Sequence, residues 1–446
     1  MDREGSEGCL QDCFEQGMEL HRKGELTNAE EQYRRVLDID PDHADALQLM
    51  GVVAAQLGNL PLAVERARLA ISKHPDQPVT YNNLGNMLVE LDRFDEAIDA
   101  YRNAIHLRPD YAHAHQNLGH VFCRVDQLLD ALQAYQRSTE LEPENADAWD
   151  SLGDSMHKIG RAEEAIDAFR RAIELAPERV PIMHRLGVAL RSLNRIDEAA
   201  AVYRRCLELR PDDPIADHFL HVCEKDAPTP ERVSREFVEK TFDEFAESFD
   251  TVLSDLQYRV PEMLGEMATD YAEQRGATDL DVVDLGCGTG LCVEPLRAIS
   301  DRLIGVDLSE KMLAKAEKRG GYDDLVREEL TSFLEARIDE FDLAFSADTL
   351  MYIGDLRPTL AAAATAVRAE GGLIFSLEKL DGDAATQDGY ALNVAGRFQH
   401  DRETIVRWLD EAGFEVRAIR EEELRDEGRE GVMGYLVEAI RKNDSE

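Results

Sequence analysis

Basic charge is scarce in this 446-residue sequence, and lysine is scarcer still. Only ten of the 50 basic residues are lysine, and 91 acidic residues bring the formal net charge to −41. Nucleic-acid-binding surfaces neutralise phosphates with clustered lysine and arginine. The charge balance therefore excludes a nucleic-acid platform, and we expect no nucleic-acid partner.

Cysteine pairs and long hydrophobic runs are also missing. The seven cysteines include no CxxC pair, a pattern typical of reduced thiols, and we expect no metal site. No apolar run approaches the ~20 residues that span a bilayer, and residues 1–7 lack the pattern of a signal peptide. We therefore expect a cytoplasmic protein with no membrane partner.

The first half of the chain repeats with a fixed period of thirty-four residues. The period carries Pro41, Pro75, Pro109, Pro143, Pro177 and Pro211, then Gly17, Gly51, Gly85, Gly119, Gly153 and Gly187, and then Ala29, Ala63, Ala97, Ala131, Ala165 and Ala199. A turn site between the glycine and the alanine holds Gly24, Gly58, Asp92, Asp126, Gly160 and Asn194, which are residue types that tolerate a left-handed backbone. The pattern predicts two helices per repeat, stacked into a superhelix.

These repeats resemble the tetratricopeptide repeat (TPR) family. We assign residues 10–226 to six repeats and a capping helix. In that family the first helix of each repeat lines a groove, and the resemblance implies a protein or peptide partner there. The candidate partner-binding residues are Asn82, Asn86, Gln116, Asn117 and His120. The amides of the asparagines and the glutamine can hydrogen-bond a peptide backbone, but all five residues could simply be solvated.

A second domain is predicted over residues 231–446, after a linker at 224–230. Its first part, 232–271, is helical in character and carries Phe237, Phe242, Phe245 and Phe249 at helix-like spacing. Such a row is usual in packing, and it could also form a lid over a ligand. We leave both interpretations open.

From residue 279 onwards, short apolar strands alternate with helices. Strands are predicted at 282–285, 303–306, 325–328, 341–346, 373–377, 415–418 and 434–439. This alternation indicates an α/β, Rossmann-like domain with a mostly parallel sheet. Ligands of such sheets bind beyond the carboxyl ends of the strands.

The first strand ends in the sequence Asp-Leu-Gly-Cys-Gly-Thr-Gly at 284–290, and Asp307 ends the second. A glycine-rich turn lets a ligand approach the backbone, and a carboxylate one strand away can accept both hydroxyls of a ribose. A dinucleotide or S-adenosylmethionine could use this pair. A dinucleotide fingerprint needs its third glycine at Leu291, which favours S-adenosylmethionine.

Residues 281–440 resemble class I S-adenosylmethionine-dependent methyltransferases, and the whole chain resembles bacterial methyltransferases that carry TPR repeats. The resemblance implies S-adenosylmethionine as cofactor. The residues that it implies for cofactor binding are Asp284, Gly286, Cys287, Gly288, Gly290, Asp307, Leu308, Glu329, Ala347 and Asp348. Capping or turn formation is the alternative role for these acids. Tyr352 and His400 are the candidate catalytic residues, and Arg397 either holds an acidic substrate or pairs with a carboxylate.

The methyl acceptor is expected to be a small molecule or a protein. The fourth strand ends in Ser-Ala-Asp at 346–348 and not in an Asn-Pro-Pro-Tyr motif, which argues against nucleobases. The predicted function is methyl transfer to such an acceptor, with the repeats recruiting a protein partner. The alternative is a non-enzymatic scaffold with a cofactor-binding or degenerate methyltransferase domain.

Overall fold

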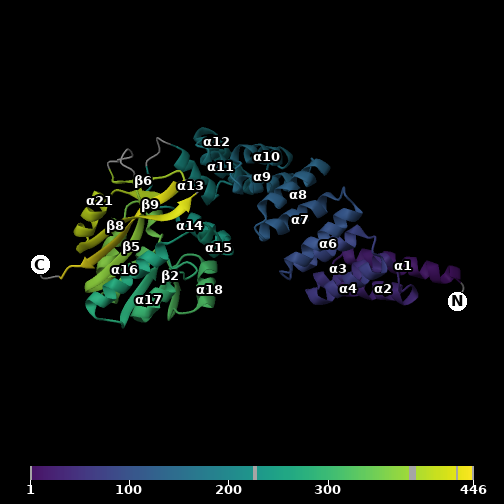
Figure 1. Ribbon diagram of the computed structural model, residues 1–446, viewed down its shortest axis with the longest axis horizontal. Coiled ribbons are helices and arrows are strands. Elements are labelled where there is room, and N and C mark those ends of the chain that lie inside the picture. The colour runs from purple at the N-terminus through teal and green to yellow at the C-terminus, as the bar shows by residue number, and fades with distance from the viewer. Residues whose placement is uncertain (1–2, 225–228, 381–387, 428–429, 444–446) are drawn as a thin grey trace. The chain divides into compact units, whose positions relative to one another are not determined.

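The computed structural model describes residues 3–224, 229–380, 388–427 and 430–443. Internal contacts divide the chain into two compact units, Met1–Asn194 and Arg195–Glu446 (Figure 1). Residues 225–228 of the predicted linker lie outside the described residues. None of the helices in the described ranges combines the length and the apolar character that crossing a membrane requires.

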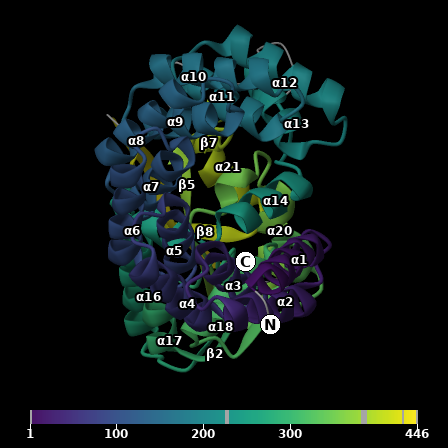
Figure 2. The ribbon, with the colours of Figure 1, turned by 90° about the vertical axis from the view of Figure 1, so that its right-hand side faces the viewer.

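The first unit is all helical, and its helices stack pair after pair (Figure 2). They are α1 (Arg3–Arg22), α2 (Leu26–Ile39), α3 (Ala44–Gln56), α4 (Leu60–Lys73), α5 (Pro78–Val89), α6 (Phe94–Leu107), α7 (Ala112–Arg124), α8 (Leu128–Leu141), α9 (Ala146–Lys158), α10 (Ala162–Leu175) and α11 (Val180–Ser192). The two-helix repeat predicted from the sequence is confirmed.

The fixed positions of the repeat have clear packing roles. The six repeated alanines are fully buried. At Gly85 an added Cβ would lie 2.5 Å from the ring of Tyr101 on the paired helix, so only glycine allows this close approach. Each turn site has a positive φ, from +55° at Asp92 to +80° at Gly58 and Gly160, which confirms the left-handed turn.

The second unit begins with the last two helices of the repeat region and continues into an α/β domain. Its helices are α12 (Ile196–Leu209), α13 (Pro214–Cys223), α14 (Arg235–Phe245), α15 (Phe249–Asp255), α16 (Val260–Arg275), α17 (Val293–Ile299), α18 (Glu310–Arg319), α19 (Leu330–Glu335), the 3₁₀ helix η1 (Leu350–Tyr352), α20 (Arg357–Ala366) and α21 (Arg402–Glu411). Its strands are β1 (Leu280–Leu285), β2 (Ser300–Asp307), β3 (Asp324–Arg327), β4 (Phe341–Ser346), β5 (Val367–Lys379), β6 (Tyr390–Leu392), β7 (Phe398–His400), β8 (Phe414–Glu427) and β9 (Glu430–Arg441).

The strands form one sheet in which β3, β2, β1, β4 and β5 are parallel neighbours. β9 adds antiparallel to β5, and β8 pairs with β9. The predicted α/β fold with a mostly parallel sheet is confirmed. The short hairpin of β6 and β7, which joins the carboxyl end of β5, was not predicted from the sequence. The strand order reverses between β1 and β4, where ligands bind in folds of this kind.

Alternate residues of the strands face two separate cores. Leu280 and Val282 of β1 pack against α16 and α17, whereas Val283 and Leu285 face the side of α14, α19, α20 and α21. Successive side chains of a strand point to opposite faces, so helices cover both faces of the sheet. The carboxyl ends of β1, β2 and β4 stay open to a ligand.

Candidate functional site

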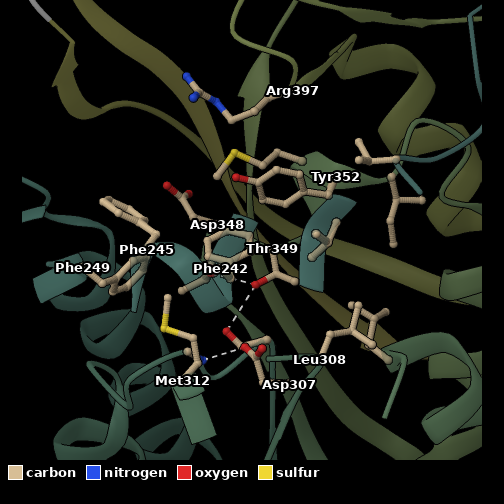
Figure 3. Close-up of a pocket in the computed structure, with 18 of the residues that line it drawn as sticks. Phe242, Phe245, Phe249, Asp307, Leu308, Met312, Asp348, Thr349, Tyr352 and Arg397 are labelled. Carbon is tan, nitrogen blue, oxygen red and sulfur yellow. Dashed lines mark hydrogen bonds between the residues drawn. The ribbon is translucent and has the colours of Figure 1, made fainter. Parts of the chain in front are cut away.

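A cavity of about 370 Å³ lies at the carboxyl ends of β1, β2 and β4 in the second unit (Figure 3). Its walls come from α14 and α15 and from the segments that follow the three strands. Of the ten predicted cofactor residues, seven line it: Gly286, Gly288, Asp307, Leu308, Glu329, Ala347 and Asp348. The fold therefore brings together positions that are up to 62 residues apart in the sequence.

The glycine turn after β1 forms one wall of this cavity. Gly286, Gly288 and Gly290 have φ values of +77°, +55° and +85°, which side chains with a Cβ rarely adopt. A Cβ on Gly286 would lie 2.0 Å from Thr349 Oγ1, so no side chain fits at this position. A Cβ on Gly288 would meet only Phe249 within 4 Å among the described residues, at 3.9 Å. Gly288 therefore presents an open backbone face to the cavity.

Asp307 stands at the end of β2, directly beside that turn. Its carboxylate accepts hydrogen bonds from the backbone N–H groups of Gly288 at 2.9 Å and Ser309 at 2.8 Å. Burial raises the pKa of Asp307, although these backbone bonds oppose the rise. The carboxylate is thus fixed at the cavity edge and holds the turn and the start of α18 in place.

Glu329 combines a place in the cavity wall with a capping role. Its carboxylate accepts from the backbone N–H of Ser332 at 2.9 Å and caps α19. Arg232 lies 3.3 Å from its other oxygen. Burial raises the pKa of Glu329, but the backbone N–H bonds outweigh it and the pKa falls below the ordinary value. Glu329 therefore has the helix-capping role that the sequence offered as its alternative.

Asp348 follows β4 and has an unusual backbone, with φ of +50°. Its carboxylate accepts from Ser376 Oγ at 2.8 Å and pairs with Arg425 at 2.7 Å. Burial raises the pKa of Asp348, and Arg425 opposes the rise. Strained backbone of this kind persists only where the surroundings enforce it, and it is frequent at functional sites.

Arg425 and Asp348 belong to a buried charge network that also contains Glu378 and Arg397. Glu378 accepts from both Arg425 and Arg397, and the Arg397 Nε–Glu378 Oε1 distance is 2.5 Å. The sequence left two roles open for Arg397, and in the structure it pairs with a carboxylate. Within the described parts of the chain, these two cations and two anions pair with one another at this end of the cavity.

Aromatic side chains cover the cavity on the side of α14 and α15. Phe242, Phe245 and Phe249 are half-buried and project into the cavity, and Phe249 packs edge-to-face with each of the other two (Figure 3). Tyr352 packs edge-to-face on Phe242, and burial raises its pKa, so its phenol is neutral at physiological pH. The phenylalanine row thus packs and lines the cavity at once.

Three predicted cofactor residues lie outside the cavity lining. Asp284 is buried and accepts from the phenol of Tyr322 at 2.6 Å. Burial raises its pKa to about 7, and the bond from Tyr322 opposes that rise. Cys287 is buried beneath the turn, and Gly290 faces Tyr322.

His400 is also outside the cavity lining. It is fully buried on β7, and its Nε2–H donates to the carbonyl oxygen of Gly354 at 2.9 Å. Burial lowers the pKa of His400 to about 4, so the ring is neutral. His400 therefore occupies a packing position outside the cavity, and it is not a candidate for the catalytic role.

The first unit holds a groove of about 640 Å³ between its helices. Three of the five predicted partner-binding residues line it, namely Asn86, Asn117 and His120. Asn82 is buried behind them and accepts from Asn117 Nδ2 at 3.1 Å. Gln116 lies outside the lining and accepts from Asn145 at 3.4 Å.

Comparison with known proteins identifies both parts of the chain. The family model described as "Methyltransferase domain" matches residues 283–375. Models described as "TPR repeat" and "Tetratricopeptide repeat" match residues 14–78, 85–125, 117–180 and 158–220. The chain carries tetratricopeptide repeats and a methyltransferase domain.

Curated relatives match the methyltransferase domain at low identity. A ubiquinone biosynthesis O-methyltransferase of Bartonella quintana is 24% identical over 152 residues, which cover 33% of this chain and 58% of the relative. A malonyl-[acyl-carrier protein] O-methyltransferase of Hamiltonella defensa is 26% identical over 149 residues, which cover 33% of this chain and 54% of the relative. The chain thus spans little more than half the length of these relatives.

A solved structure, MamA, matches 36% of this chain and 95% of its own, with 27% identity and a TM-score of 0.34.

Several cavity residues of the methyltransferase domain were not predicted as site residues. Thr349 and Met312 lie only a few residues after the ends of β4 and β2. Because ligands bind at the carboxyl ends of the strands, that position could have predicted them from the sequence. Arg425 lies on β8, 77 residues from its partner Asp348, and no local pattern marks it. It enters the site only because β8 and β9 fold back beside β5.

Proposed function

We propose that this chain transfers methyl groups from S-adenosylmethionine and that its repeats recruit a protein segment. The observation that carries the proposal is the open face of Gly288 beside the fixed carboxylate of Asp307. A ligand can approach the backbone closely only at a glycine, and a carboxylate one strand away suits a ribose.

The residues around the cavity fit the parts of S-adenosylmethionine. Asp307 would accept hydrogen bonds from the ribose hydroxyls, and Leu308 and Glu329 would flank the adenine. The turn at Gly286 and Gly288 would lie against the methionine part. Phe242, Phe245 and Phe249 would cover the bound cofactor and exclude water.

S-adenosylmethionine supplies a methyl carbon on a positively charged sulfur, which leaves with the electron pair of the broken carbon–sulfur bond. The protein must align the acceptor and keep the site dry. Tyr352, neutral because burial raises its pKa, would orient the acceptor through its phenol. Asp348 is the carboxylate on that wall, and it would take the proton of a hydroxyl acceptor.

The wall chemistry favours an uncharged acceptor with an apolar body. In the described ranges, Arg397 and Arg425 pair with Glu378 and Asp348, so both cations are already engaged within the protein. The cavity lining also includes the apolar side chains of Leu253, Leu256 and Met351. The relatives named above are O-methyltransferases, and an oxygen nucleophile agrees with this wall.

The repeat groove would bind an extended protein segment. Asn86 and Asn117 carry amides that can pair with a peptide backbone, and Asp154 and Lys158 form an ion pair at 2.8 Å along the same groove. The acceptor is either this recruited protein or a small molecule that reaches the cavity independently.

A methyl-transfer assay separates these acceptors. The full chain is incubated with methyl-labelled S-adenosylmethionine and either a metabolite extract or the proteins that it captures. Asp154→Lys places a positive charge in the groove, and Asp99→Lys makes the same change at an exposed position on α6.

We expect label transfer that requires the chain. Loss of protein labelling in Asp154→Lys alone indicates a recruited protein acceptor, whereas metabolite labelling in both variants indicates a small molecule. No label in either fraction, together with no cofactor binding, refutes the enzymatic proposal and leaves the scaffold alternative.

A further inference from the structure

Helix α13, which follows the last repeat, packs into the second unit beside α14 (Figure 1). Its start is fixed by Asp213, whose side chain accepts from the backbone N–H groups of Ile215 and Ala216, both at 3.1 Å. Pro214 occupies the first turn, where a missing N–H has no cost. One face of this helix contacts two separate segments that carry cavity-lining residues.

The first contact runs from His218 to a turn after β6. His218 is 6% exposed, and its Nε2–H donates to the carbonyl oxygen of Gly396 at 3.0 Å. Gly396 has φ of +86°, and a Cβ there would lie 2.6 Å from His218 Nε2 and 2.8 Å from Phe219. The turn therefore lies directly against α13, and only glycine fits at the contact.

That turn carries a cavity residue at its end. The backbone N–H of Asn393 donates to the carbonyl oxygen of Arg397 at 2.8 Å, and Asn393 Oδ1 accepts from the backbone N–H of Arg397 at 3.0 Å. Asn393 Nδ2 and Arg397 Nε both donate to Glu378. A shift of Gly396 would therefore move Arg397 and disturb the charge network at the acceptor end.

The second contact runs from α13 to α14, which covers the cavity. The His218 ring centroid lies 4.1 Å from that of Phe237, and Phe219 meets Phe237 edge-to-face at 5.5 Å. Lys240 of α14 places its Nζ 3.9 Å from Oδ2 of Asp213, at the start of α13. Phe242, five residues beyond Phe237 on α14, projects into the cavity.

We propose that His218 is a positioning residue of the methyltransferase site, which holds the Gly396 turn and α14 in the arrangement that binds cofactor and acceptor. The proposal rests on the proposed function. Its physical basis is that one ring, that of His218, joins both segments: it donates a hydrogen bond to the Gly396 carbonyl and packs on Phe237. If these segments lose this support, the ligand must order them when it binds. Part of the binding free energy is then spent on ordering, and the affinity falls.

The test measures S-adenosylhomocysteine affinity by titration calorimetry on the full chain. His218→Ala removes both contacts, His218→Phe keeps an aromatic ring against Phe237 but removes the donor, and His218→Gln supplies a donor again. His221→Ala is the matched control, because His221 is exposed on the same helix and bonds only locally, to Asp217. Amide hydrogen exchange of residues 393–397 and α14 is followed in each variant.

We expect the Kd to rise about tenfold in His218→Ala and His218→Phe, since an unsatisfied buried carbonyl disfavours the binding arrangement. His218→Gln should stay within about twofold of the parent, because its amide can donate to the Gly396 carbonyl. The control should match the parent. Residues 393–397 should exchange faster in His218→Phe and regain protection in His218→Gln, which a general loss of stability would not produce.

A folded His218→Phe variant with parental affinity and parental exchange at 393–397 overturns the positioning role while the proposed function stands. If His218→Ala fails to fold, His218→Phe and His218→Gln decide alone. A folded parent that binds no S-adenosylhomocysteine refutes the proposed function itself, which is a distinguishable result.

Discussion

Replacing Gly288 by alanine tests whether the open face of the glycine turn is a ligand-binding surface. The added methyl group would meet only the Phe249 ring within 4 Å among the described residues, at 3.9 Å, so the protein without ligand accommodates it. The backbone has φ of +55°, and a residue with a Cβ in this left-handed region costs about 1 kcal/mol. The fold should therefore survive the substitution.

The chain offers a matched control for the backbone cost. Gly276 ends α16 with φ of +61°, and a Cβ there would have no described atom within 4 Å. Both variants should lose about 1 kcal/mol of unfolding free energy and about 2–4 °C in melting temperature. Any further difference between Gly288→Ala and Gly276→Ala then reports the ligand and not the backbone.

The expected difference lies in cofactor affinity. A methyl group forced into a packed contact costs about 1–3 kcal/mol, which corresponds to an increase in Kd of about 5- to 150-fold. Titration calorimetry with S-adenosylmethionine should therefore show weakened binding for Gly288→Ala and parental binding for Gly276→Ala. Equal affinities in the two variants, with both folded, would refute the assignment of this turn to cofactor binding.

Two further substitutions test the fold around the sites. Burial raises the pKa of Asp284 to about 7, so the native state keeps a proton that the unfolded chain releases near its ordinary pKa of about 3.9. The parent should lose stability as pH rises from about 4 to 7, by about 1.4 kcal/mol per pH unit from this group, and denaturant unfolding of Asp284→Asn should lack that slope. Gly85→Ala places a Cβ 2.5 Å from the Tyr101 ring, whereas Gly51→Ala meets its nearest atom at 3.4 Å. Circular dichroism on denaturation should show about 1–3 kcal/mol lost in the first and little in the second, and equal losses would contradict the packing role of the repeat glycine.

The sequence predicted those features that depend on local chemistry. Each turn site of the repeats needed a left-handed backbone, and glycine, aspartate and asparagine supply it, so the helix boundaries followed. Asp307 was placed beside the glycine turn because the carboxyl ends of neighbouring parallel strands share one edge of the sheet. These arguments use residues close in sequence or joined by a simple topology.

Features that depend on distant contacts were not predictable. His400 was a candidate catalytic residue, but β7 joins the end of β5 and buries it against Gly354. Arg425 pairs with Asp348 because the β8–β9 hairpin folds back on the sheet. His218 was assigned to a capping helix, and its bond to Gly396 spans 178 residues. No local pattern encodes contacts of this range.

The measurement that tests the central claim most directly is titration of the full chain with S-adenosylmethionine, for the parent, Asp307→Ala and Asp301→Ala. Asp301 is an exposed carboxylate at the start of the same strand and controls for the loss of charge. We predict saturable binding by the parent and by Asp301→Ala. Asp307→Ala should bind at least about tenfold more weakly, since a hydrogen bond to a charged group contributes about 1.5–3 kcal/mol. Absence of binding by the folded parent, or parental affinity in Asp307→Ala, would contradict the account.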